Sequence, residues 1–203
     1  MKKVIVFGLI AALGVSAVAE ELVMRGDRRP VVTNYGQSAA KALKTVLKSN
    51  LQEKMKNEGP VGAMRFCANN AMQLTNMINR DAKKGIRIKR VALKYRNPAN
   101  EPDKLDKLAF EYFEQMKAKD GVYPADFITR LRHKQDKDIE IFRYYEPLII
   151  EKPCLACHGE TLKQEVKAEL KHLYPQDTAT GYKLGDLRGL IAVEVTPDAL
   201  VVK

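Results

Sequence analysis

The chain has 203 residues, of which 45% are apolar and 30% are charged, and its formal net charge is +10. This length fits one domain with an export signal, or at most two very small domains, and the composition is that of an ordinary globular protein. The basic charge is compatible with acidic partner proteins or anionic membrane surfaces. No Arg-rich or aromatic-interleaved motif favours nucleic acid as a partner.

The first residues have the pattern of a secretory signal peptide. Two lysines open the chain, residues 4–18 are uncharged and mostly apolar, and Ala-Val-Ala stands directly before Glu20. The apolar run is short for a membrane span, which needs about 20 residues; an uncleaved N-terminal anchor is the alternative interpretation. We therefore predict a signal peptide at residues 1–19 and a mature periplasmic domain at residues 20–203, without stable membrane insertion after cleavage.

Apolar spacing predicts two helices in the first half of the chain. The first covers residues 37–57, and Gly59-Pro60 is expected to break it. The second covers residues 61–84 and should end at Gly85, because glycine often follows the last helical turn. One face of this second helix carries Met64, Cys67, Ala71, Leu74 and Ile78.

The remaining elements alternate between strands and helices. Residues 86–95 look extended, with a change of phase near Lys89-Arg90 that suggests a bulge. The other expected elements are a turn-rich loop at 96–103, a helix at 103–118 capped by Asp103, strands at 126–132 and 138–150, a helix at 160–173, and a last strand at 190–196. This order favours an α+β domain with an antiparallel sheet.

The segment Cys154-Leu155-Ala156-Cys157-His158 follows the strand expected at 138–150. Cys-x-x-Cys-His is the attachment signature of c-type haem. In this motif the two thiols bind the two vinyl groups on one porphyrin edge, and the adjacent histidine turns its imidazole under the iron. We therefore predict haem c, covalently attached through Cys154 and Cys157, with His158 as an iron ligand. A single motif implies a single haem.

Three other interpretations of this motif exist. A thioredoxin-like redox pair usually opens a helix within a βαβ unit, and the chain shows no such unit. A zinc site would need a second pair of ligands at suitable spacing, and a chance occurrence is the third. The remaining histidines, His133 and His172, stand in charged runs and are interpreted as surface residues.

Cys67 is the third cysteine of the chain. Free cysteine on an apolar helix face is most simply a small buried residue. However, a free thiol is a liability in an oxidising compartment unless it is shielded or bound, and haem iron accepts thiolate as an axial ligand. Met64, Met72 and Met77 compete, because methionine is the commoner ligand in electron-carrying cytochromes c. The pattern alone leaves the choice open.

Five segments of the chain together resemble a known family. They are Phe66-Cys67, Arg96-Asn97-Pro98-x-Asn100-x-Pro102-Asp103, Tyr144-x-x-Pro147, Cys154-Leu155-x-Cys157-His158-Gly159 and Gly185-Asp186-Leu187-Arg188-Gly189. The family consists of secreted c-type haem proteins with a PAS-like fold and has long been a domain family of unknown function. The resemblance implies a PAS-like antiparallel sheet with N-terminal and flanking helices, a haem wedged between sheet and helix, and an axial pair of His158 and Cys67.

Two basic groups are candidates for contacts with this haem or its partners. Arg90, Arg96 and Arg143 could pair with the haem propionates, although each also fits a solvated basic face. On the helix expected after the motif, lysines recur at four-residue spacing and therefore share one face. They are Lys163, Lys167 and Lys171. This stripe could steer an acidic redox partner, although a solvated helix would look the same.

Two filled axial positions leave no place for a substrate on the iron. We therefore expect no enzyme but a periplasmic monohaem c-type cytochrome with a low-potential, low-spin ferric haem, acting in one-electron transfer. The alternative is a haem-based redox or diatomic-gas sensor module, in which the thiolate ligand is lost. A small peroxidase would need an open iron and a distal acid–base group, for which His133 is the one candidate.

Overall fold

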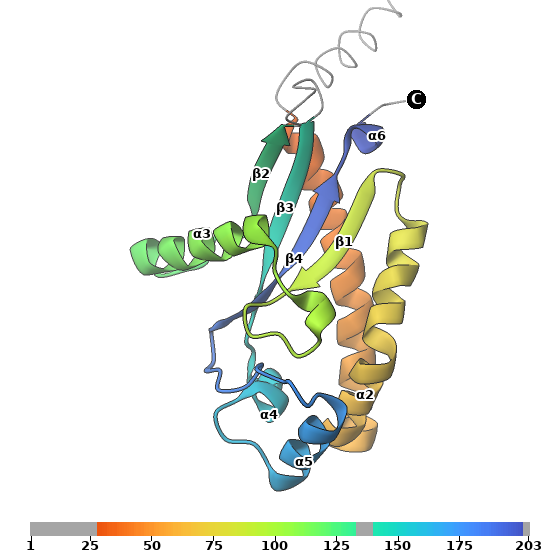
Figure 1. Cartoon of the computed structure of the whole chain (residues 1–203), viewed down its shortest axis with the longest axis vertical. Helices are drawn as coiled ribbons and strands as arrows, with labels where there is room; N and C mark the ends of the chain where they lie inside the picture. Colours follow the sequence, from red (N-terminus) through yellow and green to blue (C-terminus); the bar gives the residue numbers. More distant parts are fainter. Residues whose placement is uncertain (1–27, 133–139, 201–203) are drawn as a thin grey trace, which may run out of the picture.

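The computed structural model describes residues 28–132 and 140–200. The signal peptide predicted at residues 1–19 and the side chain of His133 therefore lie outside the described residues. Figure 1 shows a sheet that is covered on one face by helix α2 (Arg29–Asp81) and crossed on the other by α3 (Lys104–Asp120). Helices α4 (Leu155–His158) and α5 (Gln164–Leu173) lie at one end of the sheet and contact α2.

The sheet has four antiparallel strands in the order β1-β4-β3-β2. The strands are β1 (Ile86–Val91), β2 (Phe127–Arg132), β3 (Glu140–Ile149) and β4 (Leu187–Val195), and three short helical turns, η1 (Pro98–Asn100), η2 (Lys152–Cys154) and α6 (Pro197–Leu200), complete the elements. The expected α+β class, with an antiparallel sheet and N-terminal and flanking helices, is confirmed. The arrangement is consistent with a PAS-like fold.

Both faces of the sheet are buried, and this explains the phase change along β1. Ile86 and Ile88 pack in the cluster formed with α2, whereas Val91 packs in the cluster that contains Phe110 and Phe113 of α3. Because side chains alternate between faces, a strand buried on both sides shows apolar residues in both phases. The predicted bulge is therefore wrong: β1 pairs with β4 in continuous register from Ile86 to Val91.

Helix α2 runs through the position where a break was expected, but it kinks there. Gly59 has φ +69°, inside an otherwise helical segment. The following proline has no backbone N–H and disfavours helical geometry at the residue before it, and glycine takes positive φ without steric cost. Beyond the kink the helix packs on α5, with Met64 buried against Leu162 and Val166. It ends at Asp81 rather than next to Gly85.

The second half of α2 is fixed to the edge of the sheet by Asn79. Its side-chain Oδ1 accepts a hydrogen bond from the Ile88 amide at 2.7 Å, and its Nδ2 donates to the Ile88 carbonyl at 2.8 Å. The side-chain amide thereby takes the place of a neighbouring strand on the free edge of β1. This contact fixes the end of α2 to the sheet.

The later elements follow the predicted order. Helix α3 begins after Asp103, whose carboxylate accepts from the Asp106 amide while the Asp106 carboxylate accepts from the Asp103 amide. This reciprocal cap ends the turn-rich loop. The strands expected near 126–132, 138–150 and 190–196 are β2, β3 and β4, and the helix expected at 160–173 is α5. Across residues 28–132 and 140–200, no helix is long and apolar enough to cross a bilayer.

Candidate functional site

The Cys-x-x-Cys-His segment forms two short turns where the chain leaves β3. Cys154 ends η2, and Leu155 to His158 form the single turn of α4. Gly159 follows at a tight exit, because a Cβ atom there would lie 2.7 Å from the carbonyl oxygen of Leu155. Leu155 and Cys154 pack against the cluster of Ile150, Ala179 and Tyr182. The motif is therefore held as a compact, preformed turn.

A second segment, residues 177–182, folds over this turn. The Tyr182 amide donates to the His158 carbonyl at 3.0 Å, and the Gly181 amide donates to the Gly159 carbonyl at 3.1 Å. The Tyr182 ring meets the His158 ring edge to face, with 6.2 Å between the centroids. The His158 Nδ1 donates to the Ala179 carbonyl at 2.7 Å. Since Nδ1 carries the proton, Nε2 is the nitrogen left with a lone pair for a metal.

The imidazole of His158 is held in its neutral form. Burial lowers the pKa of His158 well below its ordinary value, and the nearby guanidinium groups of Arg188 and Arg96 lower it further. The hydrogen bond to the Ala179 carbonyl opposes this shift. Neutral imidazole is the form that binds metal ions, so the environment favours ligation.

Cys67 lies on α2 close to the motif. Burial raises the pKa of the Cys67 thiol, and the guanidinium groups of Arg90 and Arg96 oppose this rise. Burial also raises the pKa of Cys157, whose thiol interacts electrostatically with Cys67. The Sγ of Cys157 lies 4.0 Å from the Pro60 carbonyl at the kink of α2. The structure thus brings the predicted site residues Cys67, Cys157 and His158 into one region.

The competing methionines have other surroundings. Met64 is buried against Leu162, Val166 and Leu170 of the α5 cluster, and Met77 is 48% exposed. Met72 lines a cavity of about 310 Å³ between α2 and β1, and His158 does not line that cavity. On this half of α2, the geometry favours Cys67 over the methionines as the group that faces the motif.

A smaller cavity, of about 180 Å³, lies directly beside His158. Its other wall residues are Val91, Ala92, Leu148 and Gly189, which offer no polar side-chain group, and the polar residues Arg90, Asn100 and Arg188. Arg90 and Asn100 also line the larger cavity, so the two spaces adjoin. The Nε of Arg90 is buried and has no hydrogen-bond partner within the part of the chain that the structure describes.

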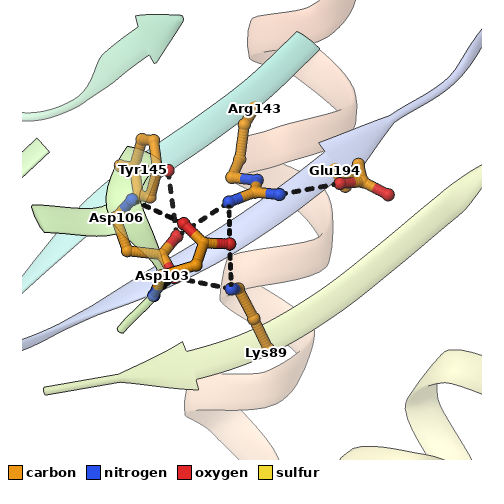
Figure 2. Close-up of polar contacts among 6 residues, drawn as sticks. All are labelled: Lys89, Asp103, Asp106, Arg143, Tyr145 and Glu194. Atoms are coloured by element: carbon orange, nitrogen blue, oxygen red, sulfur yellow. Dashed lines mark hydrogen bonds and ion pairs between the residues drawn. The ribbon is translucent and has the colours of Figure 1, made fainter. Parts of the chain in front are cut away.

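The three arginines suggested as propionate partners differ in their surroundings. Arg90 lines the cavity beside His158. Arg96 donates to the Cys157 carbonyl at 2.7 Å and pairs with Asp177. Arg143 lies outside that cavity: its guanidinium binds Asp103, Asp106 and Glu194 on the α3 face of the sheet (Figure 2). Arg143 lines the larger cavity instead, and its pairing with three carboxylates favours Arg90 over Arg143 as a propionate partner.

Arg188 is a site residue that the sequence reasoning missed. It lines the cavity beside His158, and its Cζ lies 5.5 Å from the centroid of the Tyr182 ring. Its Nη1 donates to the Lys94 carbonyl at 3.1 Å. Burial lowers the pKa of Arg188. The sequence feature that could have identified it was its place near the start of the last strand, inside the Gly-Asp-Leu-Arg-Gly segment.

The lysine stripe and His172 lie on the surface, as expected. Lys163 precedes the first residue of α5, and Lys167, Lys171 and His172 are exposed on that helix. The apolar side of α5 faces α2 instead, through the buried Val166 and Leu170. The stripe therefore stands on the outer surface, on the helix that packs beside the Cys67 segment.

The sequence and the fold were compared with those of known proteins. The family model described as Tll0287-like matches residues 29–196, and no curated protein matches the chain. Among solved structures, the crystal structure of the cyanobacterial haem protein Tll0287 superposes with a TM-score of 0.62 at 24% identity, covering 83% of this chain and 96% of that one. This likeness shows a shared fold. Because the family model spans most of the sequence, the chain belongs to the Tll0287-like family.

Proposed function

We propose that this chain is an exported monohaem c-type cytochrome with His/Cys axial ligation that acts in one-electron transfer. The observation that carries the proposal is the geometry of the motif. Two free cysteines and a neutral imidazole with its Nδ1–H engaged lie in consecutive turns, beside a cavity lined by Arg90, whose Nε has no hydrogen-bond partner in the described part of the chain. Membership of a family in which Tll0287 is a haem protein supports it.

The residues around the cavity fit a haem. Buried donors in proteins are nearly always hydrogen-bonded, so the Nε of Arg90, which has no partner among residues 28–132 and 140–200, calls for an acceptor. A haem propionate is such an acceptor, and carboxylates pair favourably with guanidinium groups. Val91 and Leu148 supply an apolar surface for a porphyrin ring on the same walls. In this proposal Cys154 and Cys157 hold the haem covalently.

The axial positions are assigned to His158 and Cys67. Bound haem supplies a reversible one-electron iron couple. His158 is held neutral, and Arg90 and Arg96 favour the thiolate form of Cys67 against the effect of burial. If residues of the chain fill both axial positions of the iron, no site is left there for a substrate. We therefore propose an electron carrier and not an enzyme.

Haem attachment is the direct test of this proposal. When the chain is exported from a host with a haem-attachment system, we expect the mature protein to gain the mass of one haem and to give a c-type pyridine haemochrome spectrum. Cys154→Ser or Cys157→Ser should leave a single thioether and shift the haemochrome band, and the double variant should lose covalent haem. Mass spectrometry and haem staining of denatured protein measure both effects.

Cys67→Ser is the matched control for attachment, because this third cysteine stands outside the motif and should leave the covalent haem in place. A parent protein that is colourless and shows no gain in mass would contradict the proposal. Covalent haem that persists in the Cys154→Ser, Cys157→Ser double variant would contradict the assigned linkage.

An acidic protein is the proposed redox partner, with Lys163, Lys167 and Lys171 as its docking stripe. Replacing the three lysines with glutamate should slow electron exchange with an anionic reagent such as hexacyanoferrate by roughly tenfold at low ionic strength, and added salt should remove the difference. The control reverses three exposed lysines of α3, namely Lys104, Lys107 and Lys119. Equal slowing in both variants would argue against a specific stripe.

A further inference from the structure

We propose that Arg96 and Asp177 form a buried clamp that positions His158, by holding the Ala179 carbonyl on the imidazole Nδ1. The inference rests on the proposed function, because it concerns the histidine assigned to the iron. Neither residue is proposed to touch the haem iron, so both act as positioning residues.

The two side chains form a forked ion pair. Arg96 Nε donates to Asp177 Oδ1 at 3.2 Å, and Arg96 Nη2 lies 3.2 Å from Asp177 Oδ2. The side chains are only 12% and 7% exposed, respectively. The planar guanidinium matches a carboxylate in this two-point geometry, which fixes direction as well as distance. The pair joins the loop after β1 to the loop after α5.

Each member of the pair also bonds to a group next to the imidazole. Arg96 Nη2 donates to the Cys157 carbonyl at 2.7 Å, one residue before His158. Asp177 Oδ1 accepts from the Ala179 amide at 2.8 Å, and the Ala179 carbonyl accepts from His158 Nδ1 at 2.7 Å. The contacts close a ring that runs from Arg96 through Asp177, Ala179, His158 and Cys157 back to Arg96.

The surroundings hold the guanidinium in one plane. Its Cζ lies 5.8 Å from the centroid of the Tyr174 ring, and stacking on an aromatic face restricts its rotation. The same loop is tied once more, where Thr178 Oγ1 donates to the Tyr95 carbonyl at 3.0 Å. That last bond does not touch any group bonded to His158, so it anchors the loop without acting on the imidazole.

The hydrogen bond on Nδ1 determines three properties of a histidine ligand: its tautomer, the orientation of its ring and its strength as an electron donor. A clamp that holds the accepting carbonyl therefore controls all three from a distance. Without it, the Ala179 carbonyl is released from the position that the Asp177 bond imposes. The imidazole then donates less charge, and the ferric state loses stability relative to the ferrous state.

The test uses the haem-loaded protein and two substitutions. Asp177→Asn removes the charge that holds the guanidinium, and Arg96→Lys keeps a cation but loses the fork. We expect Asp177→Asn to shift the ferric-to-ferrous ratio at a fixed applied potential by roughly tenfold toward ferrous, an effect of the same order as the loss of metal affinity or activity when an outer-shell partner of a metal-bound histidine is removed. Arg96→Lys should shift it in the same direction by less. The ferric electron paramagnetic resonance signal should become heterogeneous in both.

Two control variants distinguish an effect on the position of His158 from a general loss of stability. Arg65 forms the same kind of fork with Glu169, at 2.8 and 3.0 Å, but joins α2 to α5 and bonds to no residue of the haem motif. Arg65→Gln should therefore leave the ferric-to-ferrous ratio unchanged. Thr178→Val removes the side-chain hydrogen bond to the Tyr95 carbonyl but keeps the backbone bond from the Thr178 amide at 3.4 Å, and it should also leave the ratio unchanged.

If Arg96 and Asp177 act as one unit, their effects are not additive. The double variant Asp177→Asn, Arg96→Lys should then shift the ferric-to-ferrous ratio no further than Asp177→Asn alone. The inference would be overturned if both single variants kept the ferric-to-ferrous ratio and the electron paramagnetic resonance signal of the parent protein and lost only thermal stability. Arg96→Lys keeps a cation opposite Asp177, so it avoids the large cost of an unpaired buried charge. Absence of haem in the parent protein would instead contradict the proposed function.

Discussion

Replacing Cys67 with alanine is expected to abolish the low-spin ferric signal of the parent protein and to raise its reduction potential. Thiolate donates charge to the iron and favours the ferric state, so its loss favours the ferrous state. Electron paramagnetic resonance, absorption spectra and a redox titration of parent and variant measure the effect. Carbon monoxide should bind the reduced Cys67→Ala protein readily, because the variant leaves an axial position open.

Met72→Leu is the matched control, since Met72 stands on the same half of α2 and was a competing ligand in the sequence. It should leave the spectra and the potential unchanged. If Met72→Leu removes the low-spin signal while Cys67→Ala does not, the axial assignment of Cys67 is wrong, although the covalent haem would stand. Carbon monoxide binding to the reduced parent would favour the sensor alternative over the carrier.

Replacing Asp106 with alanine should lower the free energy of unfolding by about 3–5 kcal/mol, the usual cost of removing one partner of a buried ion pair. Figure 2 shows this carboxylate at the centre of a polar cluster on the α3 face of the sheet. The side chain has no exposed area. It accepts from Arg143 Nη1 and Tyr145 Oη, each at 3.0 Å, and from Lys89 Nζ at 2.5 Å. Urea unfolding monitored by circular dichroism measures the loss.

Asp120→Ala is the control for Asp106→Ala, because Asp120 is exposed at the other end of α3. It should change the free energy of unfolding by less than about 0.5 kcal/mol. An Asp106→Ala variant as stable as this control would show that the cluster of charges does not hold α3 to the sheet. The haem should remain attached in both variants.

The neighbouring Asp103 gives this cluster a pH dependence. Burial by itself would raise the pKa of Asp103, but hydrogen bonds from the Asp106 amide, Arg143 and Lys89 outweigh it and place the pKa well below its ordinary value. The folded state therefore gains stability from the ionised carboxylate above the unfolded pKa of about 4, and this gain is lost as the pH falls toward the folded pKa. Asp103→Asn should cost stability at pH 7, and the difference from the parent should narrow below about pH 4. A constant difference from pH 7 to pH 3 would contradict this assignment.

Local signals explain why most elements were predictable. The cap at Asp103 depends on bonds within one helical turn, and α3 begins where the sequence indicated. Likewise, Cys154 to His158 needs only its own spacing to place two thiols and an imidazole on one turn. Local geometry of this kind is a property of adjacent residues, so the sequence alone reveals it. The bulge in β1 was wrong because burial of both faces is not a local property.

The partners of the arginines were decided only by the tertiary structure. Arg90 and Arg143 look alike in the sequence, as basic residues inside strands. Alternation directs Arg90 toward the cavity beside His158, whereas Arg143 points to the carboxylates near α3. The pairing of Arg96 with Asp177 joins residues 81 positions apart. No short-range pattern encodes such contacts, because they depend on how the kinked α2, the sheet and the last loops pack together.

The sequence by itself therefore determined the α+β class, the order of the elements and the turn of the Cys-x-x-Cys-His segment. The tertiary structure decided which buried charges meet, which thiol faces the motif and which carbonyl holds His158. The physical reason is the range of the interactions. Caps, turns and periodicity act within a few residues, whereas buried ion pairs and cavities form only when distant segments exclude water together.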